Sequence, residues 1–215
     1  GLAQLVDAIW RDDVKTVLAL MRKNPKLLTE DVLIRKSNWG KPLSYAANLG
    51  RDEIVEALYA LGARDLEHAL DRAVLQSQIG TALKIHALMG SPPPPEGALG
   101  GAAYTLSISG TELVLKLGGR VRDAVGRRLA PVDVVLETDS RKPEAKHAIL
   151  EIYVQHGLEL PDTPTMALHR GRIDLLEAHR RRDPGRQRKG DGAHRRSRGP
   201  GIARLSPAGR TGGAA

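Results

Sequence analysis

The sequence predicts an all-α fold in which about six helix-turn-helix repeats stack as an α-solenoid. Apolar residues recur at helical spacing in one short segment after another from residue 2 to residue 184. Glycines close successive segments at Gly62, Gly90, Gly119 and Gly157, with spacings of 28, 29 and 38 residues. The chain of 215 residues is 41% hydrophobic but only 3% aromatic, with no Phe. Its core therefore consists of Leu, Ile, Val and Ala, which suits closely packed helices.

The stretch Lys41–Asp65 is the clearest repeat and contains two helix patterns back to back. Pro42 suits the first position of a helix, because the N–H that proline lacks would be unsatisfied there. Gly50 ends this helix, Asp52 begins the next one, and Gly62 ends it. The predicted buried positions of the two helices are Leu43, Ala46, Ala47, Ile54, Val55, Leu58 and Leu61. Neither helix could bury its apolar face alone, so the repeat requires neighbours.

This stretch resembles an ankyrin repeat. The positions that match the family pattern, in order, are Pro42, Leu43, Ala46, Ala47, Gly50, Ile54, Val55, Leu58, Gly62 and Ala63. Three positions depart from it, since Lys41 stands for Thr, and Ser44 and Arg51 stand for His. Residues 163–182, which begin Thr-Pro and continue through Gly171 and Ile173, contain a second match. The resemblance implies a binding scaffold with no chemistry of its own.

Four weaker helix pairs complete the predicted solenoid domain, which spans residues 2–184. Residues 2–24 form a polar-faced capping repeat, of the kind expected at the end of a solenoid. Residues 65–90, 98–119 and 131–157 form the third, fourth and fifth pairs, the last with an extra loop at Thr138–Lys142. Pro92–Pro95 is a stiff polyproline II segment, read either as a loop between repeats or as a ligand for an aromatic groove.

The net charge of +8 resides in one segment at the C-terminal end of the sequence. Residues 180–215 hold eleven Arg and Lys against two Asp, whereas residues 1–179 hold 22 basic and 23 acidic side chains. Residues 185–215 are rich in Arg and Gly and have few aliphatic residues, so we expect a disordered tail there. Because the last helix would lack a neighbour, we also expect that further repeats follow in the full protein and that this tail is a truncation or frameshift product.

The sequence shows no constellation typical of an enzyme, a cofactor site or a metal site. It has no Cys, and its single Glu-x-x-His motif, Glu144 with His147, is read as a solvated first helical turn. The Gly-rich run at 97–101 lacks a dinucleotide-binding spacing and is read as a turn with close helix packing. No apolar run approaches the length of a membrane span, and we expect a cytoplasmic monomer.

The predicted function is protein–protein interaction through the repeat turns and the concave helix face, as the ankyrin resemblance implies. By position, the candidate partner-binding residues are Asn38, Trp39, Tyr45, Asn48, Leu49, His169 and Arg170. We expect the double substitution Tyr45→Ala with Asn48→Ala to weaken partner binding without changing stability. The alternatives are core packing for these side chains and, for the chain, nonspecific binding of nucleic acid or an acidic surface through the basic tail.

Overall fold

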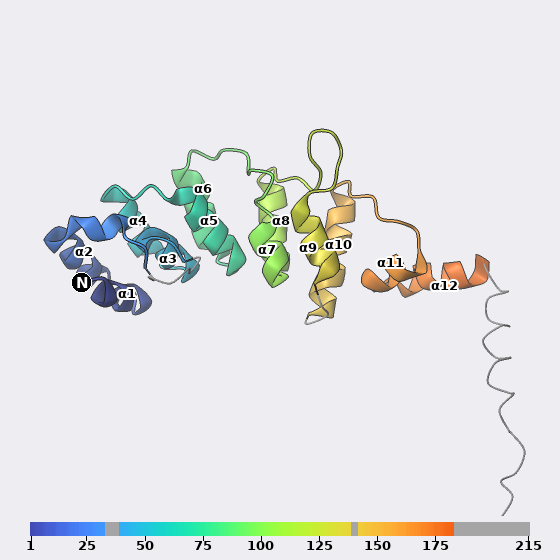
Figure 1. Cartoon of the computed structure of the whole chain (residues 1–215), viewed down its shortest axis with the longest axis horizontal. Helices are drawn as coiled ribbons and strands as arrows, with labels where there is room; N and C mark the ends of the chain where they lie inside the picture. The colour runs from blue at the N-terminus through green and yellow to red at the C-terminus, as the bar shows by residue number, and fades with distance from the viewer. Residues whose placement is uncertain (33–38, 139–141, 183–215) are drawn as a thin grey trace, which may run out of the picture. The chain divides into compact units, whose positions relative to one another are not determined.

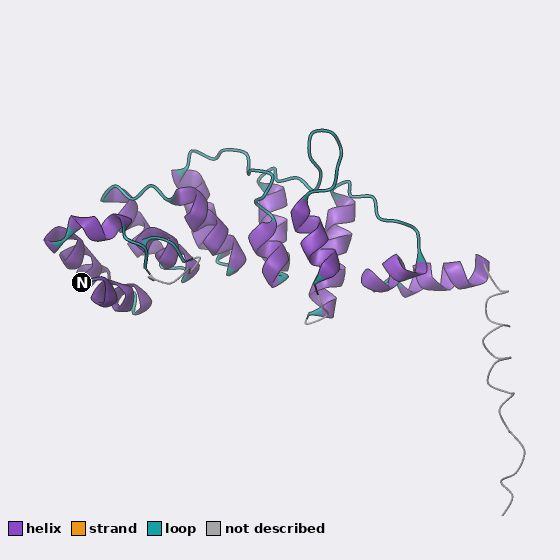
Figure 2. Cartoon of the chain, viewed as in Figure 1, coloured by secondary structure: helices purple, strands orange, loops and turns teal. Residues whose placement is uncertain are grey.

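The computed structural model describes residues 1–32, 39–138 and 142–182, and these contain helices joined by loops (Figures 1 and 2). No strand occurs in these ranges, where one isolated antiparallel bridge joins Arg122 and Arg128, so the predicted all-α class is confirmed. The predicted tail at 185–215 lies outside the described residues. The helices are α1 (Leu2–Trp10), α2 (Val14–Lys23), the 3-10 helix η1 (Pro25–Thr29), α3 (Pro42–Asn48), α4 (Asp52–Ala60), α5 (Leu66–Leu75), α6 (Ile79–Leu88), α7 (Gly100–Thr105), α8 (Ile108–Lys116), α9 (Ala130–Glu137), α10 (Pro143–Gln155), α11 (Pro164–His169) and α12 (Ile173–Arg182).

The chain divides into two compact units, Gly1–Ile173 and Asp174–Ala215. Within the first unit, consecutive helices pair, as α1 with α2, α3 with α4, α5 with α6, α7 with α8 and α9 with α10. The first helix of each pair also packs against the first helix of the next, from α1 through α3, α5 and α7 to α9. Second helices pack in the same way at α2 with α4, α6 with α8 and α8 with α10. Each pair thus buries its apolar faces chiefly against its neighbours in the sequence.

The turn between the two helices has the same backbone geometry in four of these pairs, and it recurs between α11 and α12. One residue of each turn is left-handed, with φ of 61° at Asp12, 68° at Gly50, 58° at Ser77, 53° at Leu106 and 63° at Gly171. The amide that follows it donates to the carbonyl of a buried alanine, Ala8, Ala46, Ala73, Ala102 or Ala167, at 2.8–3.0 Å. This is a common way to end a helix. The geometry therefore recurs even where the glycine expected at a left-handed position is missing.

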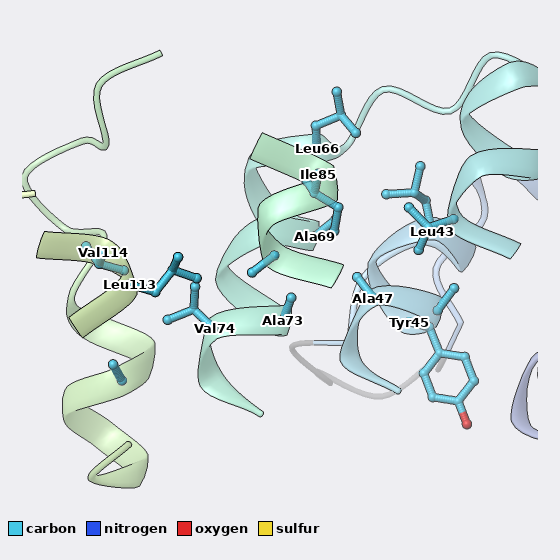
Figure 3. Close-up of a cluster of buried hydrophobic side chains, with 14 of the residues drawn as sticks. Leu43, Tyr45, Ala47, Leu66, Ala69, Ala73, Val74, Ile85, Leu113 and Val114 are labelled. Carbon is cyan, nitrogen blue, oxygen red and sulfur yellow. The ribbon is translucent and has the colours of Figure 1, made fainter. Parts of the chain in front are cut away.

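Small and branched aliphatic side chains form the core, as the composition predicts. Figure 3 shows Ala47 of α3 and Ala73 of α5 on facing sides of their helices, with Val74 toward Leu113 of α8. Six of the seven buried positions predicted in the clearest repeat are fully enclosed, namely Leu43, Ala46, Ala47, Ile54, Val55 and Leu58. Enclosing a Leu or Ile side chain contributes about 1.5–3 kcal/mol. The prediction was wrong for Leu61, which follows the last residue of α4 and is 44% exposed.

The long connection of the fifth repeat lies before its first helix. Residues 117–129 join α8 to α9, whereas only residues 138–142 separate α9 from α10. The Asp123 carboxylate accepts hydrogen bonds from the amides of Val125 (3.0 Å) and Arg127 (2.8 Å), which closes the tip of this connection. The extra residues expected at Thr138–Lys142 are therefore mainly in the α8–α9 connection.

Candidate partner-binding surface

One predicted partner-binding residue of α3 stacks on another that precedes the helix, and a third lies outside the described residues. Tyr45 is 3% exposed, and its ring centroid lies 5.3 Å from that of the half-buried Trp39, with the rings 20° from parallel. Burial raises the pKa of the Tyr45 hydroxyl. Asn38 is the residue not described. The stack gives Trp39 and Tyr45 a packing role, which was the structural alternative for both.

Asn48 connects α3 to α5 rather than facing solvent. Its side-chain oxygen accepts hydrogen bonds from Nε (3.1 Å) and Nη2 (2.6 Å) of Arg72, and both residues are at least nine-tenths buried. Burial lowers the pKa of the Arg72 guanidinium, and the nearby Asp71 carboxylate opposes that shift. Buried polar groups that lose a partner destabilise a fold by about 1–3 kcal/mol. We therefore correct the expectation that Tyr45 and Asn48 could be removed without a change in stability.

The first helix of the clearest repeat has no open face. All seven residues of α3 are buried, and Leu49, which follows it, is half-buried against the core. The exposed helix face expected at this repeat is therefore covered. The sequence pattern could not reveal this, because Tyr45 and Asn48 fall at positions that the ankyrin resemblance assigns to the surface.

Arg170, predicted as a surface residue, forms an ion pair with the preceding repeat. Its Nε and Nη2 lie 2.5 Å and 2.9 Å from the two carboxylate oxygens of Glu151 on α10, and Arg172 adds a third contact at 3.1 Å. These bonds hold the pKa of the Glu151 carboxylate below its usual value, and the bond from Arg170 has the largest effect. Half-buried His169 and exposed Leu168 line a hollow of about 290 Å³ together with His147 and Pro143.

Two exposed aromatic side chains that were not predicted as site residues occupy the turn position of Asn48. Trp10 is 59% exposed and Tyr104 is 69% exposed. Each lies two residues before the left-handed residue of its turn, as Asn48 does before Gly50. We call the residues at this position the turn row, which comprises Trp10, Asn48, Leu75, Tyr104 and His169. Trp10 and Tyr104 could have been identified by counting two residues back from each turn. The sequence does not reveal these two turns, however, because Asp12 and Leu106 take the place of the usual glycine.

Tyr104 lines one surface hollow, and Lys142 borders both that hollow and a second, wider one. The hollow that Tyr104 lines measures about 240 Å³ and also includes Thr138 and Lys142. A wider one of about 600 Å³ lies between the α5–α6 turn, at residues 75–77, and the α7–α8 turn, at residues 105–109. The Lys142 Nζ donates to the Thr105 carbonyl oxygen at 3.1 Å and borders both hollows. An aromatic side chain beside such hollows is typical of a protein-binding surface.

A separate cavity of about 300 Å³ lies at the junction of the third and fourth repeats. Pro92–Pro95 lines it, together with α5, α8 and Met89. We call it the proline-walled cavity. The proline segment therefore does more than separate two repeats, although nothing in its geometry requires the alternative role of a polyproline ligand.

The described residues hold no group of three or more His, Asp or Glu side chains arranged to bind a metal ion. Among these same residues, no helix is both long and apolar enough to cross a bilayer. No protein-family model matches the chain, and no curated protein sequence matches it.

Proposed function

We propose that this chain is an ankyrin-like repeat scaffold that binds a partner protein through the turn row. The observation that carries the proposal is the exposure of two large aromatic side chains, Trp10 and Tyr104, at equivalent positions of separate repeats. Aromatic residues contribute much of the free energy of protein–protein binding, because they offer a large contact area for little loss of side-chain entropy.

The recurring turn and the packing of consecutive helix pairs support the ankyrin-like part of the proposal. The two repeats that resemble ankyrin most closely, at 41–65 and 163–182, both have glycine at the left-handed position. Three further turns reach the same geometry with Asp12, Ser77 and Leu106. A family whose repeats vary in sequence but keep one backbone geometry would produce this combination.

The proposed mechanism is the rigid display of side chains, with little rearrangement on binding. Tyr104 occupies the end of α7, which is packed against α5 and α9. Its neighbours Ala102 and Ala103 are fully buried, so the helix end cannot shift without opening the core. A partner would contact the Tyr104 ring and fill the hollow that this ring lines, so that binding requires mainly desolvation of a preformed surface.

The test compares the full chain with Tyr104→Ala and, as a matched control, Val125→Ala, which removes a 74% exposed side chain from the α8–α9 connection. Proteins captured from an extract of the source cell are quantified for each variant, and thermal unfolding verifies the fold. We expect Tyr104→Ala to reduce capture of the partner by about tenfold or more, as for other interface aromatics. Retained capture by Tyr104→Ala, or equal loss in both variants, would contradict the proposal.

A further inference from the structure

The proline-walled cavity combines an apolar interior with a pair of carboxylates. Leu70 and Val74 of α5 line one side, and Val114 of α8 and Leu117, which follows α8, line another. The polar side chains that line it are Glu67 and Asp71, which lie one turn apart on α5 and are both exposed. The cavity therefore offers apolar contact inside and negative charge at its opening.

The proline wall is held in place by its own chemistry and by one hydrogen bond. Proline has a fixed φ and no N–H, so Pro92–Pro95 cannot continue α6 and instead presents rings as an apolar surface. The Nε2 of His86 lies 2.8 Å from the Pro92 carbonyl oxygen and donates to it. His86 is buried on α6, so the bond fixes the first proline to a packed helix. The cavity is consequently formed before any ligand arrives.

The two carboxylates form no salt bridge with another residue in the described part of the chain, although Asp71 attracts the neighbouring Arg72 electrostatically. Arg72 follows Asp71 directly, but its guanidinium is buried on Asn48. Arg120 pairs at 3.4 Å with Glu96, which does not line the cavity. A Cβ atom added at Gly101 of α7 would lie 3.1 Å from Asp71 Oδ1, so the close contact of α5 with α7 restricts where Asp71 can move.

We infer that the proline-walled cavity binds a lysine or arginine side chain of the partner protein. The aliphatic stem packs between the prolines and the side chains of α5 and α8, and the charged end lies between Glu67 and Asp71. Such side chains commonly bury their stem along apolar surface while the charge stays near water. A neutral side chain would cover the carboxylates without balancing their charge, and an acidic one would be repelled.

This inference names the chemistry of the partner and rests on the proposed function, but it uses a different surface from Tyr104. The two can therefore fail separately. If Tyr104→Ala abolishes capture of the partner but the cavity does not bind basic side chains, the proposed function stands and this inference fails. If the cavity prefers basic side chains while capture is independent of Tyr104, the turn row is the part that fails.

The experiment uses the methionine methyl groups of the full chain as reporters. The chain has three Met residues, of which Met89 lines the cavity, while Met21 is a buried residue of α2 and Met166 lies on α11. With 13C-labelled methyl groups, the protein is titrated with capped tripeptides Ala-Lys-Ala, Ala-Arg-Ala and Ala-norleucine-Ala, and with guanidinium chloride. Norleucine supplies the stem without the charge, and guanidinium supplies the charge without the stem.

We expect the Lys or Arg tripeptide to shift the Met89 signal saturably at about millimolar concentration, which is ordinary for a ligand of this size. Norleucine should bind about tenfold more weakly, guanidinium should give no saturable shift, and Met21 and Met166 should not respond. A Met89 signal that does not respond, or that responds equally to norleucine, would overturn the inference. So would equal shifts of all three methionines.

Charge variants test the role of the carboxylates without removing any apolar wall. The double substitution Glu67→Gln with Asp71→Asn should weaken binding of the basic tripeptides by about tenfold and leave norleucine binding unchanged. The matched control Glu96→Gln removes a nearby carboxylate that does not line the cavity, and it should bind as the unaltered chain does. If the control loses as much affinity as the double variant, the effect is one of general charge and the inference is wrong.

Discussion

Several non-glycine residues of this chain adopt a left-handed backbone conformation, which side chains other than that of Gly disfavour by about 1–2 kcal/mol. Asp12, Ser77 and Leu106 do so in the turns within helix pairs, and Ser91 does so after α6 with φ of 56°. Asp12 and Ser77 make side-chain contacts, to Arg51 and Ser107 respectively. Ser91 is exposed, and its side chain forms no hydrogen bond with another described residue. A substitution at Ser91 therefore measures the free-energy cost of the left-handed backbone conformation alone.

Ser91→Gly should raise the free energy of unfolding by up to about 1 kcal/mol, because glycine adopts this conformation without the steric penalty. Urea unfolding of the full chain measures the change. The control is Ser109→Gly, at an exposed helical position of α8, where glycine should lower stability by roughly 0.5 kcal/mol. Changes of the same sign in both variants would show that the left-handed conformation at Ser91 costs little.

Capping of the helices shows how one repeat depends on the next. Thr163 caps α11 from within its own repeat by accepting the Met166 amide at 3.1 Å. Lys41 precedes α3 at the corresponding place and cannot do the same. Instead Asp65, which precedes α5, accepts from the amide (3.2 Å) and hydroxyl (2.5 Å) of Ser44. The departure from Thr at position 41 is thus offset by a carboxylate from the following repeat.

Asp65→Ala should lower the free energy of unfolding by about 1–2 kcal/mol, the usual effect of losing a helix cap. Asp65→Asn should retain most of the stability, because its amide oxygen can still accept. Glu53→Ala, which removes an exposed acid from the first turn of α4, should cost about 0.5 kcal/mol or less. Chemical unfolding measures the stability of each variant, and amide exchange measures how far α3 is protected in it. An alanine variant as stable as the Glu53 control would refute the capping role.

Across the whole molecule, neighbouring repeats stabilise each other through local contacts, so a single junction can open by itself. The junction of α10 with α11 depends on Glu151, which contacts Arg170 and Arg172. Because the folded-state pKa of Glu151 is lowered, its contribution is present above the ordinary glutamate pKa and is lost as the pH falls through the folded value. The acid form cannot hold both arginines.

Amide exchange of α11 should therefore accelerate relative to α3–α6 as the pH falls from about 5 to about 3. Exchange is measured by mass spectrometry and corrected for the intrinsic effect of pH. Glu151→Gln should make amide exchange of α11 fast at every pH, so that the acceleration between about pH 5 and pH 3 disappears. If the Gln variant shows the same acceleration as the unaltered chain, another carboxylate controls the junction.

The sequence by itself determined the all-α class, the limits of the clearest helices, the glycines that end them and six of the seven core positions predicted in the clearest repeat. Those features follow from local periodicity, because side chains one turn apart share a face whatever lies opposite. Only the tertiary structure decided which faces stay open. Asn48 is buried by Arg72 of the next repeat, whereas Tyr104 at the equivalent position remains exposed. Equal sequence positions differ in exposure because a neighbouring element covers one of them and leaves the other uncovered, and helical spacing carries no information about that neighbour.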